Sequence, residues 1–302
     1  MRFEPTAEQR DYAGSLDRLL AAVDVPRVAR AWAAGDRAPG LALWERLLEQ
    51  GLGALALEAT PVEVCVGFEA LGRHGVPGPW VESAAYLPVL LGRELDGPGS
   101  VAVLPHVPRA LDADVATTLL VVDGDQARTA TAGASHASVD PARHLYDVVV
   151  GDPVTVAGSP SEAFDLAVLA ASAQLLGLGE ALLDASVVHV KQRRQFGREI
   201  GSYQAVKHRL ADVRIGLDFA RPLLQGAALG EVPVSAAKVA CGDAAYAAAR
   251  AALQVHGAIG YTRELDLGRR ILAVRALVGA WGTPAHHRAA LLEHLSARAG
   301  AR

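Results

Sequence analysis

The chain has 302 residues, of which 51% are hydrophobic and 21% charged, so it can bury at least one large core and is neither disordered nor fibrous. The formal net charge of −4 gives no electrostatic reason to expect binding to nucleic acid or to a membrane surface, and we expect neither. At about 150 residues per domain the length suggests about two domains, although one interlocked unit is also compatible with it.

The two cysteines and the apolar stretches indicate the cellular compartment of the protein. Cys65 and Cys241 lie far apart in the sequence, without the spacing of a zinc site or a disulfide framework, and are expected to be small buried apolar residues in a reducing cytoplasm. The sequence starts with acidic residues where a signal peptide would need an apolar run. The longest uncharged apolar stretch, 166–179, is shorter than the roughly 20 residues of a membrane span. We therefore expect a cytoplasmic location.

The pattern of apolar residues divides the chain into three parts. Residues 1–92 are predicted to form a helical N-terminal domain, because apolar residues such as Leu16, Leu19, Leu20 and Val23 recur at spacings of three and four. Residues 93–157 contain short β-rich runs at 101–104, 118–122 and 146–150, and Asp123-Gly124 is a hairpin signal. This middle part is predicted to be a small β domain.

Residues 158–302 are predicted to form a four-helix bundle. Ser159, Pro160 and Glu162 supply a capping box at the start of a long helix, whose apolar seam continues to Val190. Further helices are predicted around the seam at 206–224, over 235–256, and from 284 to about 296. The predicted fold class is therefore mainly α with a small β section.

Searches for generic catalytic and metal-binding motifs give little. The sequence has no Walker loop, no Gly-x-Ser-x-Gly and no His-Glu-x-x-His. Gly177-Leu-Gly179 lies within a helical seam and not after a strand, so close helix packing explains it better than a dinucleotide site. His286, His287 and His294 are better explained as a solvated helix face than as a metal site, and we expect no metal.

Two segments, 191–212 and 254–270, interrupt the helical seams with polar residues and glycines. Each places arginines, an aromatic ring, glutamine and glycines where a helix ends, a combination suited to holding phosphates and a flat ring. Taken on composition alone, a charged turn between helices is the favoured interpretation.

Both segments closely resemble the two C-terminal signatures of the acyl-CoA dehydrogenases. The matching residues are Arg193-x-x-Phe196-Gly197-x-x-Ile200-Gly201-x-x-Gln204-x-x-x-His208-x-Leu210-Ala211-Asp212 and Gln254-x-x-Gly257-x-x-Gly260-Tyr261. The order of helices, β section and helical bundle is also that of the family. The resemblance implies an FAD-dependent enzyme that oxidises an acyl-CoA thioester to its 2-enoyl form, with a carboxylate taking the α-proton while the β-hydride goes to FAD.

The resemblance also implies roles for individual residues in cofactor binding. Arg193 would contact the pyrophosphate of an FAD bound mainly to a neighbouring subunit, with Phe196 beside the cofactor and Gln254 on its ADP portion. Gly257 belongs to the same turn, and Ala258 stands where the family has a small glycine next to the phosphates.

The positions that usually hold the catalytic base are not filled by carboxylates. The family's Glu-Gly-Thr step reads Trp281-Gly282-Thr283 here, and the alternative base position, before the first long bundle helix, is Ala167. Asp165 and Glu162 lie nearby, but a shift of two or more residues turns a side chain far around a helix. We therefore assign no catalytic residue to this chain.

The middle of the chain departs from the family as well. The family's loop and strand that cover the flavin ring and meet the acyl-CoA are missing between residues 100 and 156, and Trp281 would help to fill the vacated site. The pattern resembles the short, degenerate subunit of heteromeric α2β2 acyl-CoA dehydrogenases from actinobacterial steroid and cholesterol side-chain breakdown. It implies a partner subunit that supplies the catalytic glutamate and the thioester site, and an electron-transfer acceptor.

Three other interpretations stay open. The chain could work alone as a homodimeric acyl-CoA dehydrogenase, with Asp165 or Glu162 as the base and a rearranged flavin site. It could instead be a non-enzymatic structural protein on the same scaffold, with motifs kept because they shape the interhelical turns. A side reaction in secondary metabolism is a third interpretation, which no residue specifically supports.

Overall fold

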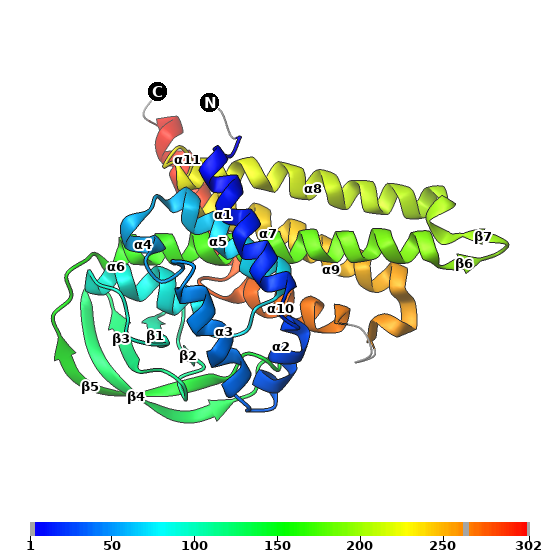
Figure 1. The fold of residues 1–302 in the computed structure, drawn as a ribbon. Coiled ribbons are helices and arrows are strands. Elements are labelled where there is room, and N and C mark those ends of the chain that lie inside the picture. The colour runs from blue at the N-terminus through cyan, green and yellow to red at the C-terminus, as the bar shows by residue number, and fades with distance from the viewer. Residues whose placement is uncertain (1–3, 262–265, 301–302) are drawn as a thin grey trace.

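The computed structural model describes residues 4–261 and 266–300, and in it helices flank a small sheet in chain order (Figure 1). The N-terminal helices are α1 (Ala7–Ala21), α2 (Val25–Ala33), α3 (Ala38–Leu48), α4 (Leu55–Glu58), α5 (Pro61–His74), a π-helical turn (Glu82–Tyr86) and α6 (Leu87–Leu91). Capping boxes at Thr6 and Thr60 start α1 and α5, because each hydroxyl and a side chain three residues on bond the free backbone N–H groups.

The sheet has five strands in the order β1-β3-β4-β5-β2. They are β1 (Gly99–Leu104), β2 (Ala110–Leu111), β3 (Thr118–Asp123), β4 (Gln126–His136) and β5 (Leu145–Val154). The three predicted β runs lie in β1, β3 and β5. The hairpin signal is confirmed, since β3 and β4 pair antiparallel around the two-residue loop Gly124-Asp125. The long strand β4 was not predicted, because its small and polar residues lie mostly at the surface and show no apolar alternation.

The C-terminal part contains the helices α7 (Pro160–Gln192), α8 (Gln204–Ala228), α9 (Val234–His256), α10 (Leu267–Gly279) and α11 (Pro284–Gly300), with 3-10 turns at Ile200–Ser202 and Gly257–Tyr261. The predicted start of α7 is confirmed, since the Ser159 hydroxyl accepts from the Glu162 backbone N–H at 3.4 Å. Helix α10 was not predicted from the sequence; it begins at Leu267, near the end of the second family-like segment, and packs against α7 and α9. The four helices expected in this part are present, with α10 in addition.

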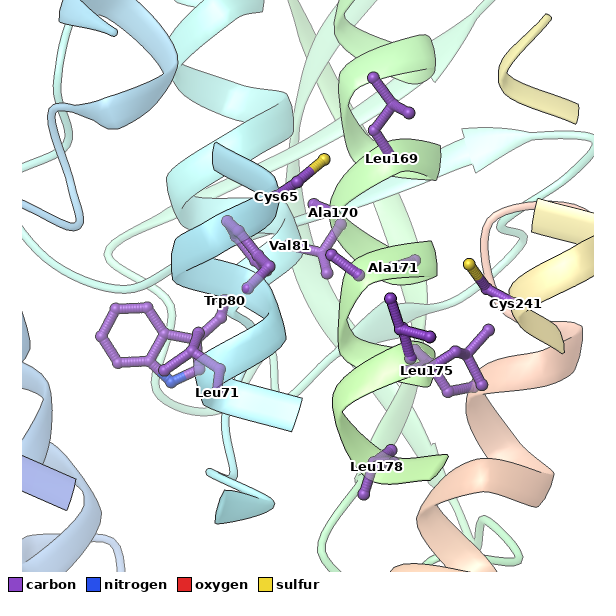
Figure 2. Packing of buried hydrophobic residues seen from close by; sticks show 14 of the residues in the cluster. Cys65, Leu71, Trp80, Val81, Leu169, Ala170, Ala171, Leu175, Leu178 and Cys241 are labelled. Atoms are coloured by element: carbon purple, nitrogen blue, oxygen red, sulfur yellow. The ribbon is translucent and has the colours of Figure 1, made fainter. Parts of the chain in front are cut away.

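The core lies where α5 and α9 pack on α7. In Figure 2 Cys65 of α5 points toward Leu169 and Ala170 of α7, while Cys241 approaches α7 from α9 and Leu71 lies beside Trp80. Both cysteines are buried and free, as predicted. Burial raises the pKa of the Cys241 thiol to about 12 and that of Cys65 further, so both thiols act as apolar groups.

Small residues on α5 and α7 let the two helices approach backbone to backbone. A Cβ added at Gly72 of α5 would lie 2.1 Å from the Gln174 carbonyl oxygen, and one added at Gly177 of α7 would lie 2.1 Å from the Glu69 carbonyl oxygen. One added at Gly179 would lie 2.7 Å from Cδ2 of Leu217 on α8. The prediction that Gly177-Leu-Gly179 serves helix packing is therefore confirmed.

Helix α7 is the central element of the C-terminal part. It is long and apolar enough to cross a membrane by length and composition, but 94% of its most apolar window is buried inside the fold. The core helix of a folded domain shows this combination. Candidate functional residues lie at both ends of α7, and the 33 residues of the helix keep these two groups far apart.

Candidate functional site

A small hairpin carries the first family-like segment beyond the end of the bundle (Figure 1). Its strands β6 (Arg194–Gln195) and β7 (Arg198–Glu199) pair antiparallel around Phe196 and Gly197. These two residues have φ of +52° and +82°, the positive values of a type I′ turn. A bulky residue at positive φ is uncommon and points to a constraint other than local stability. Phe196 is 89% exposed, so the turn presents this ring to solvent.

Arg193 links α7 to the hairpin. Its backbone N–H donates to the His189 carbonyl at 2.9 Å, and its own carbonyl accepts from the Ile200 N–H at 2.8 Å, which fixes the base of the hairpin. The Arg193 side chain is exposed and forms no salt bridge with a carboxylate in the described part of the chain. Its guanidinium is therefore available for an anion from outside the chain.

The second family-like segment lines a shallow depression of about 390 Å³ at the end of α9. Gln254 and Gly257 lie in it, together with Arg250 of α9 and Arg209 of α8. Gly257 ends α9 with φ +62°. A Cβ added there would meet nothing within 4 Å, so the glycine is explained by this backbone conformation and not by lack of space. Ala258 follows it on the surface.

Arg209 and Arg250 were missed in the sequence analysis. Arg250 lies one helical turn before Gln254, so the i, i+4 spacing alone places both side chains on one face of α9 and could have pointed to it. Arg209 lies on another helix, and no sequence signal connects it with Gln254. Two guanidinium groups and an amide around one depression suit a phosphate-bearing ligand.

The hairpin and the depression lie at the same end of the bundle, because their helices meet there. The rings of His189 on α7 and His256 on α9 stack with centroids 4.1 Å apart. Burial lowers the pKa of His189, and the neighbouring His256 and Arg193 lower it further. The structure therefore brings the two family-like segments together; residues 262–265 of the second one lie outside the described part.

The interior position where the family places a base is closed. Trp281 is 1% exposed, and its ring lies 5.2 Å from that of Tyr86 and 5.8 Å from that of Phe164. Ala167 is fully buried within α7. Neither side chain can take the α-proton, and the indole fills the interior between Tyr86 and Phe164.

The two carboxylates near the start of α7 differ in their surroundings. Asp165 lines a cavity of about 420 Å³ together with Phe164, and burial raises the pKa of its carboxyl. Glu162 lies in the first turn of α7; it is exposed, as Asp165 is, but lines no such cavity among the described residues. Asp165 is thus the better placed of the two for contact with a ligand.

One expectation about the histidines was wrong. His287 is 1% exposed and does not lie on a solvated helix face. Its Nε2 lies 2.8 Å from the Trp281 carbonyl oxygen and its Nδ1 lies 3.0 Å from the Ser235 hydroxyl. Among the residues that the structure describes, no group of His, Cys, Asp and Glu side chains could hold a metal ion. His287 instead fixes the backbone that carries Trp281.

Comparison with known proteins identifies the fold and the family. Residues 159–296 match the model of the acyl-CoA dehydrogenase C-terminal domain. The chain is 31% identical over 289 residues to acyl-CoA dehydrogenase IpdE2 of Mycobacterium tuberculosis, which covers 87% of this chain and 89% of the relative. This chain belongs to the acyl-CoA dehydrogenase family. The family consists of FAD-binding oxidoreductases that act on CH–CH bonds.

Solved structures agree with this fold. The ChsE4-ChsE5 complex from Mycobacterium tuberculosis contains a chain that superposes with a TM-score of 0.78 at 22% identity, covering 98% of this chain and 99% of that one. The Tcur3481-Tcur3483 steroid acyl-CoA dehydrogenase gives a TM-score of 0.75 at 20% identity, with 97% and 99% covered.

The residues present fit one part of FAD better than the other. Arg193, Arg209, Arg250 and Gln254 are exposed donors at one end of the bundle, suited to the phosphates and the ADP portion. At the family's base position the buried indole of Trp281 packs on Tyr86 and Phe164 and offers no carboxylate. The chain therefore fits the anionic portion of the family's cofactor, and lacks the base that the family places at the ring.

Proposed function

We propose that this chain is the subunit without a catalytic base in a heteromeric, α2β2 acyl-CoA dehydrogenase. It contributes binding contacts to an FAD that is bound mainly by a longer partner subunit. The partner supplies the catalytic glutamate, a complete β domain and the thioester site. The substrate is an acyl-CoA ester, and a steroid or cholesterol side-chain CoA ester is the class that we put forward.

The observation that carries this proposal is the separation of two sites within one chain. Phe164, which packs on Trp281, lies 29 residues before Arg193 along α7 and its C-cap. At 1.5 Å per helical residue this is roughly 44 Å. One FAD cannot reach both places, so Arg193 and Phe196 serve a cofactor in another subunit.

The surface of the hairpin supports the same conclusion. An unpaired guanidinium and an 89% exposed phenylalanine at positive φ contribute little to the stability of this chain. Both become useful when another molecule covers them, because burying an exposed aromatic ring and pairing an arginine with a phosphate are each favourable.

Different residues of this chain would contact different parts of the cofactor. The Arg193 fork would hold the pyrophosphate, Phe196 would pack beside the cofactor, and Gln254 with Gly257 and Ala258 would contact the ADP portion. When bound, FAD supplies the acceptor for the substrate β-hydride. Because Trp281 cannot take a proton, the α-proton would go to a carboxylate of the partner.

The names of similar proteins support the substrate class and the two-chain assembly. ChsE4-ChsE5 is described as a complex, and Tcur3481-Tcur3483 is described as a steroid acyl-CoA dehydrogenase. Their identities of 22% and 20% relate these proteins to the present chain by fold. The partner and the substrate therefore remain part of the proposal.

One specific observation favours a second candidate, a homodimeric enzyme that works alone. Asp165 lines a cavity of about 420 Å³, and burial raises the pKa of its carboxyl in the direction that a general base requires. Yellow isolated protein that is bleached anaerobically by an acyl-CoA would support this candidate. Colourless isolated protein would support the two-subunit proposal.

The test uses the chain co-expressed with a longer acyl-CoA dehydrogenase that forms a stable complex with it. The flavin content per complex is measured for the wild type, for Arg193→Ala, and for the control Arg288→Ala, which removes an exposed arginine paired with Asp243. We expect Arg193→Ala to lose most of the flavin and Arg288→Ala to keep it. Full flavin occupancy in Arg193→Ala, with an intact complex by size exclusion, would refute the role of Arg193.

A further inference from the structure

The end of the bundle that carries the hairpin is rich in positive charge. Four exposed cations lie there that the proposed function does not assign to FAD: Lys191, Arg194, Arg198 and Lys207. They belong to the last turn of α7, to the hairpin and to the first turn of α8, which meet at this end (Figure 1). Together these four residues form the basic end of the bundle.

None of the cations of the basic end is neutralised by the chain itself. Within residues 4–261 and 266–300 none of the four forms a salt bridge with a carboxylate, and the neighbouring acids Glu199 and Asp212 form none either. The guanidinium carbon of Arg198 lies 3.9 Å from the centroid of the Tyr203 ring. This stacking holds the guanidinium in place and leaves the donors at its edge free for an anion.

The charge of this end contrasts with that of the rest of the chain. Residues 191–212 hold six basic and two acidic side chains, a surplus of four positive charges. The whole chain has a net charge of −4, so the remainder is strongly negative. Most protein surfaces intersperse the two signs, whereas a field of one sign steers a partner of the opposite charge.

Exposed apolar side chains among the cations favour a protein as the partner. Phe196 at the tip of the hairpin is 89% exposed, and Val188 near the end of α7 is 54% exposed. Protein interfaces combine buried aromatic and arginine side chains with a polar rim. A long polyanion such as nucleic acid fits this end less well, because it would also meet the acidic remainder of the chain.

We propose that the basic end docks on an acidic surface of the FAD-bearing partner subunit, and that this charge contact steers the assembly of the two chains. The inference rests on the proposed function, because that function places this end of the bundle against the partner. Arg193, Arg209 and Arg250 already match the phosphates of FAD, so the four other cations need an anion of their own. Burying them unpaired in the interface would be costly, so carboxylates of the partner have to meet them.

The test measures the rate constant of association between this chain and the immobilised longer subunit at several salt concentrations. From about 0.1 M to about 1 M NaCl, the distance over which charges act falls from about 10 Å to about 3 Å. We expect the association rate constant to fall at least about tenfold over this range, because electrostatic steering accelerates association by about 10–10³-fold. An association rate constant that does not change with salt would overturn the proposal.

Charge reversals locate the contact. The double variant Arg194→Glu/Lys207→Glu should lower the association rate constant at least about tenfold at about 0.1 M NaCl, and the loss should shrink at about 1 M. The matched control is Arg27→Glu/Arg46→Glu, which changes the net charge equally at two exposed arginines of α2 and α3. Equal losses in the two double variants would overturn the proposal, because net charge and not its position would then govern association.

Flavin content separates a failure of this proposal from a failure of the proposed function. The complex assembled with Arg194→Glu/Lys207→Glu should keep its flavin, because neither residue is assigned to FAD. A wild-type association rate in this variant would overturn the acidic contact alone, whereas full flavin in Arg193→Ala would refute the FAD contact. Loss of flavin in the double variant would also overturn the proposal, because its cations would then act through the cofactor.

Nucleic acid is the alternative occupant that the same variants test. The chain alone should not bind a duplex DNA oligonucleotide with a Kd below about 1 μM at about 0.15 M NaCl. Binding of that strength, lost in Arg194→Glu/Lys207→Glu, would overturn the proposal and identify the basic end as a nucleic-acid surface.

Discussion

Gly177 of α7 lies directly against the backbone of Glu69 in α5. A Cβ at position 177 would lie 2.1 Å from the Glu69 carbonyl oxygen and 2.7 Å from the Arg73 backbone nitrogen. Real Cβ atoms do not approach backbone atoms so closely, so a side chain at this position would force the two helices apart. The contact joins the N-terminal helices to the central helix of the bundle.

Gly177→Ala should therefore destabilise the fold by about 3 kcal/mol or more, because the steric conflict is with backbone and cannot be relieved by a rotamer change. The matched control is Gly242→Ala in α9, where an added Cβ meets nothing within 4 Å. It should be neutral or should stabilise the protein by up to ~1 kcal/mol through helix propensity. Urea unfolding of both variants measures the difference, and equal stabilities would contradict the prediction.

The buried Glu180 joins three helices through charged hydrogen bonds. Its carboxylate accepts from Arg214 at 2.6 and 2.7 Å and from Arg221 at 3.0 Å, and Arg221 also donates to Glu69 of α5. Glu180→Gln should cost about 3–5 kcal/mol, because it leaves two arginines without their shared partner. The exposed pair Asp243–Arg288 is the control, and Asp243→Asn should cost at most ~1 kcal/mol.

The Glu180 pair also predicts a pH dependence. Burial pushes the pKa of Glu180 upward, but hydrogen bonds from Arg214 and Arg221 outweigh it, so the pKa lies below its ordinary value. The folded state therefore holds fewer protons than the unfolded state at acid pH. The stability advantage of the wild type over Glu180→Gln should be full above the unfolded pKa of about 4.3 and should shrink as the pH falls below it. A stability difference between the two proteins that stays constant from about pH 3 to about pH 7 would contradict this prediction.

Lys238 predicts a second rise of stability with pH, in an alkaline window. Its Nζ is buried in α9 and donates to the Leu277 carbonyl at 2.9 Å and to the Ala280 carbonyl at 2.7 Å. Burial lowers the pKa of Lys238 to about 7, with a further contribution from Arg143. The unfolded chain then holds more protons than the folded one between about pH 7 and 10.4, so folding is favoured as the pH rises through that window.

Unfolding at pH 7, 8 and 9 tests this on the wild type and on Lys238→Met. The stability of the wild type should rise relative to the variant by up to about 1.4 kcal/mol per pH unit. The variant keeps the apolar stem but loses both hydrogen bonds to the end of α10, so it should also be less stable at pH 9. Parallel pH profiles for the two proteins would show that Lys238 stays charged in the fold.

Trp281 should matter for stability rather than for catalysis by the isolated chain. Trp281→Ala should cost about 3–5 kcal/mol, because it leaves a cavity between Tyr86 and Phe164. Trp281→Phe keeps most of the volume and should cost less. Neither variant should oxidise an acyl-CoA without a partner, as followed by flavin bleaching. Dehydrogenation by the isolated Trp281→Ala protein would contradict the assignment of the base to another subunit.

Most of the helices could be predicted from the sequence, because their caps and apolar spacing are local. Ser159 and Glu162 determine the start of α7, and Gly257 determines the end of α9. The exposed strand β4 could not be predicted, since its pairing with β3 and β5 comes from the rest of the sheet and not from its own side chains. Helix α10 was missed because it follows a motif rich in glycine and charge.

For the candidate site, the sequence by itself determined which residues belong to the family signatures, because Arg193, Phe196 and Gln254 keep a fixed spacing along the chain. Only the tertiary structure decided that Arg209 and Arg250 join Gln254 and that His287 is buried beneath Trp281. The physical reason is that caps, turns and spacing act between neighbours in the chain. Burial, unpaired atoms and cavities arise only when distant segments pack together.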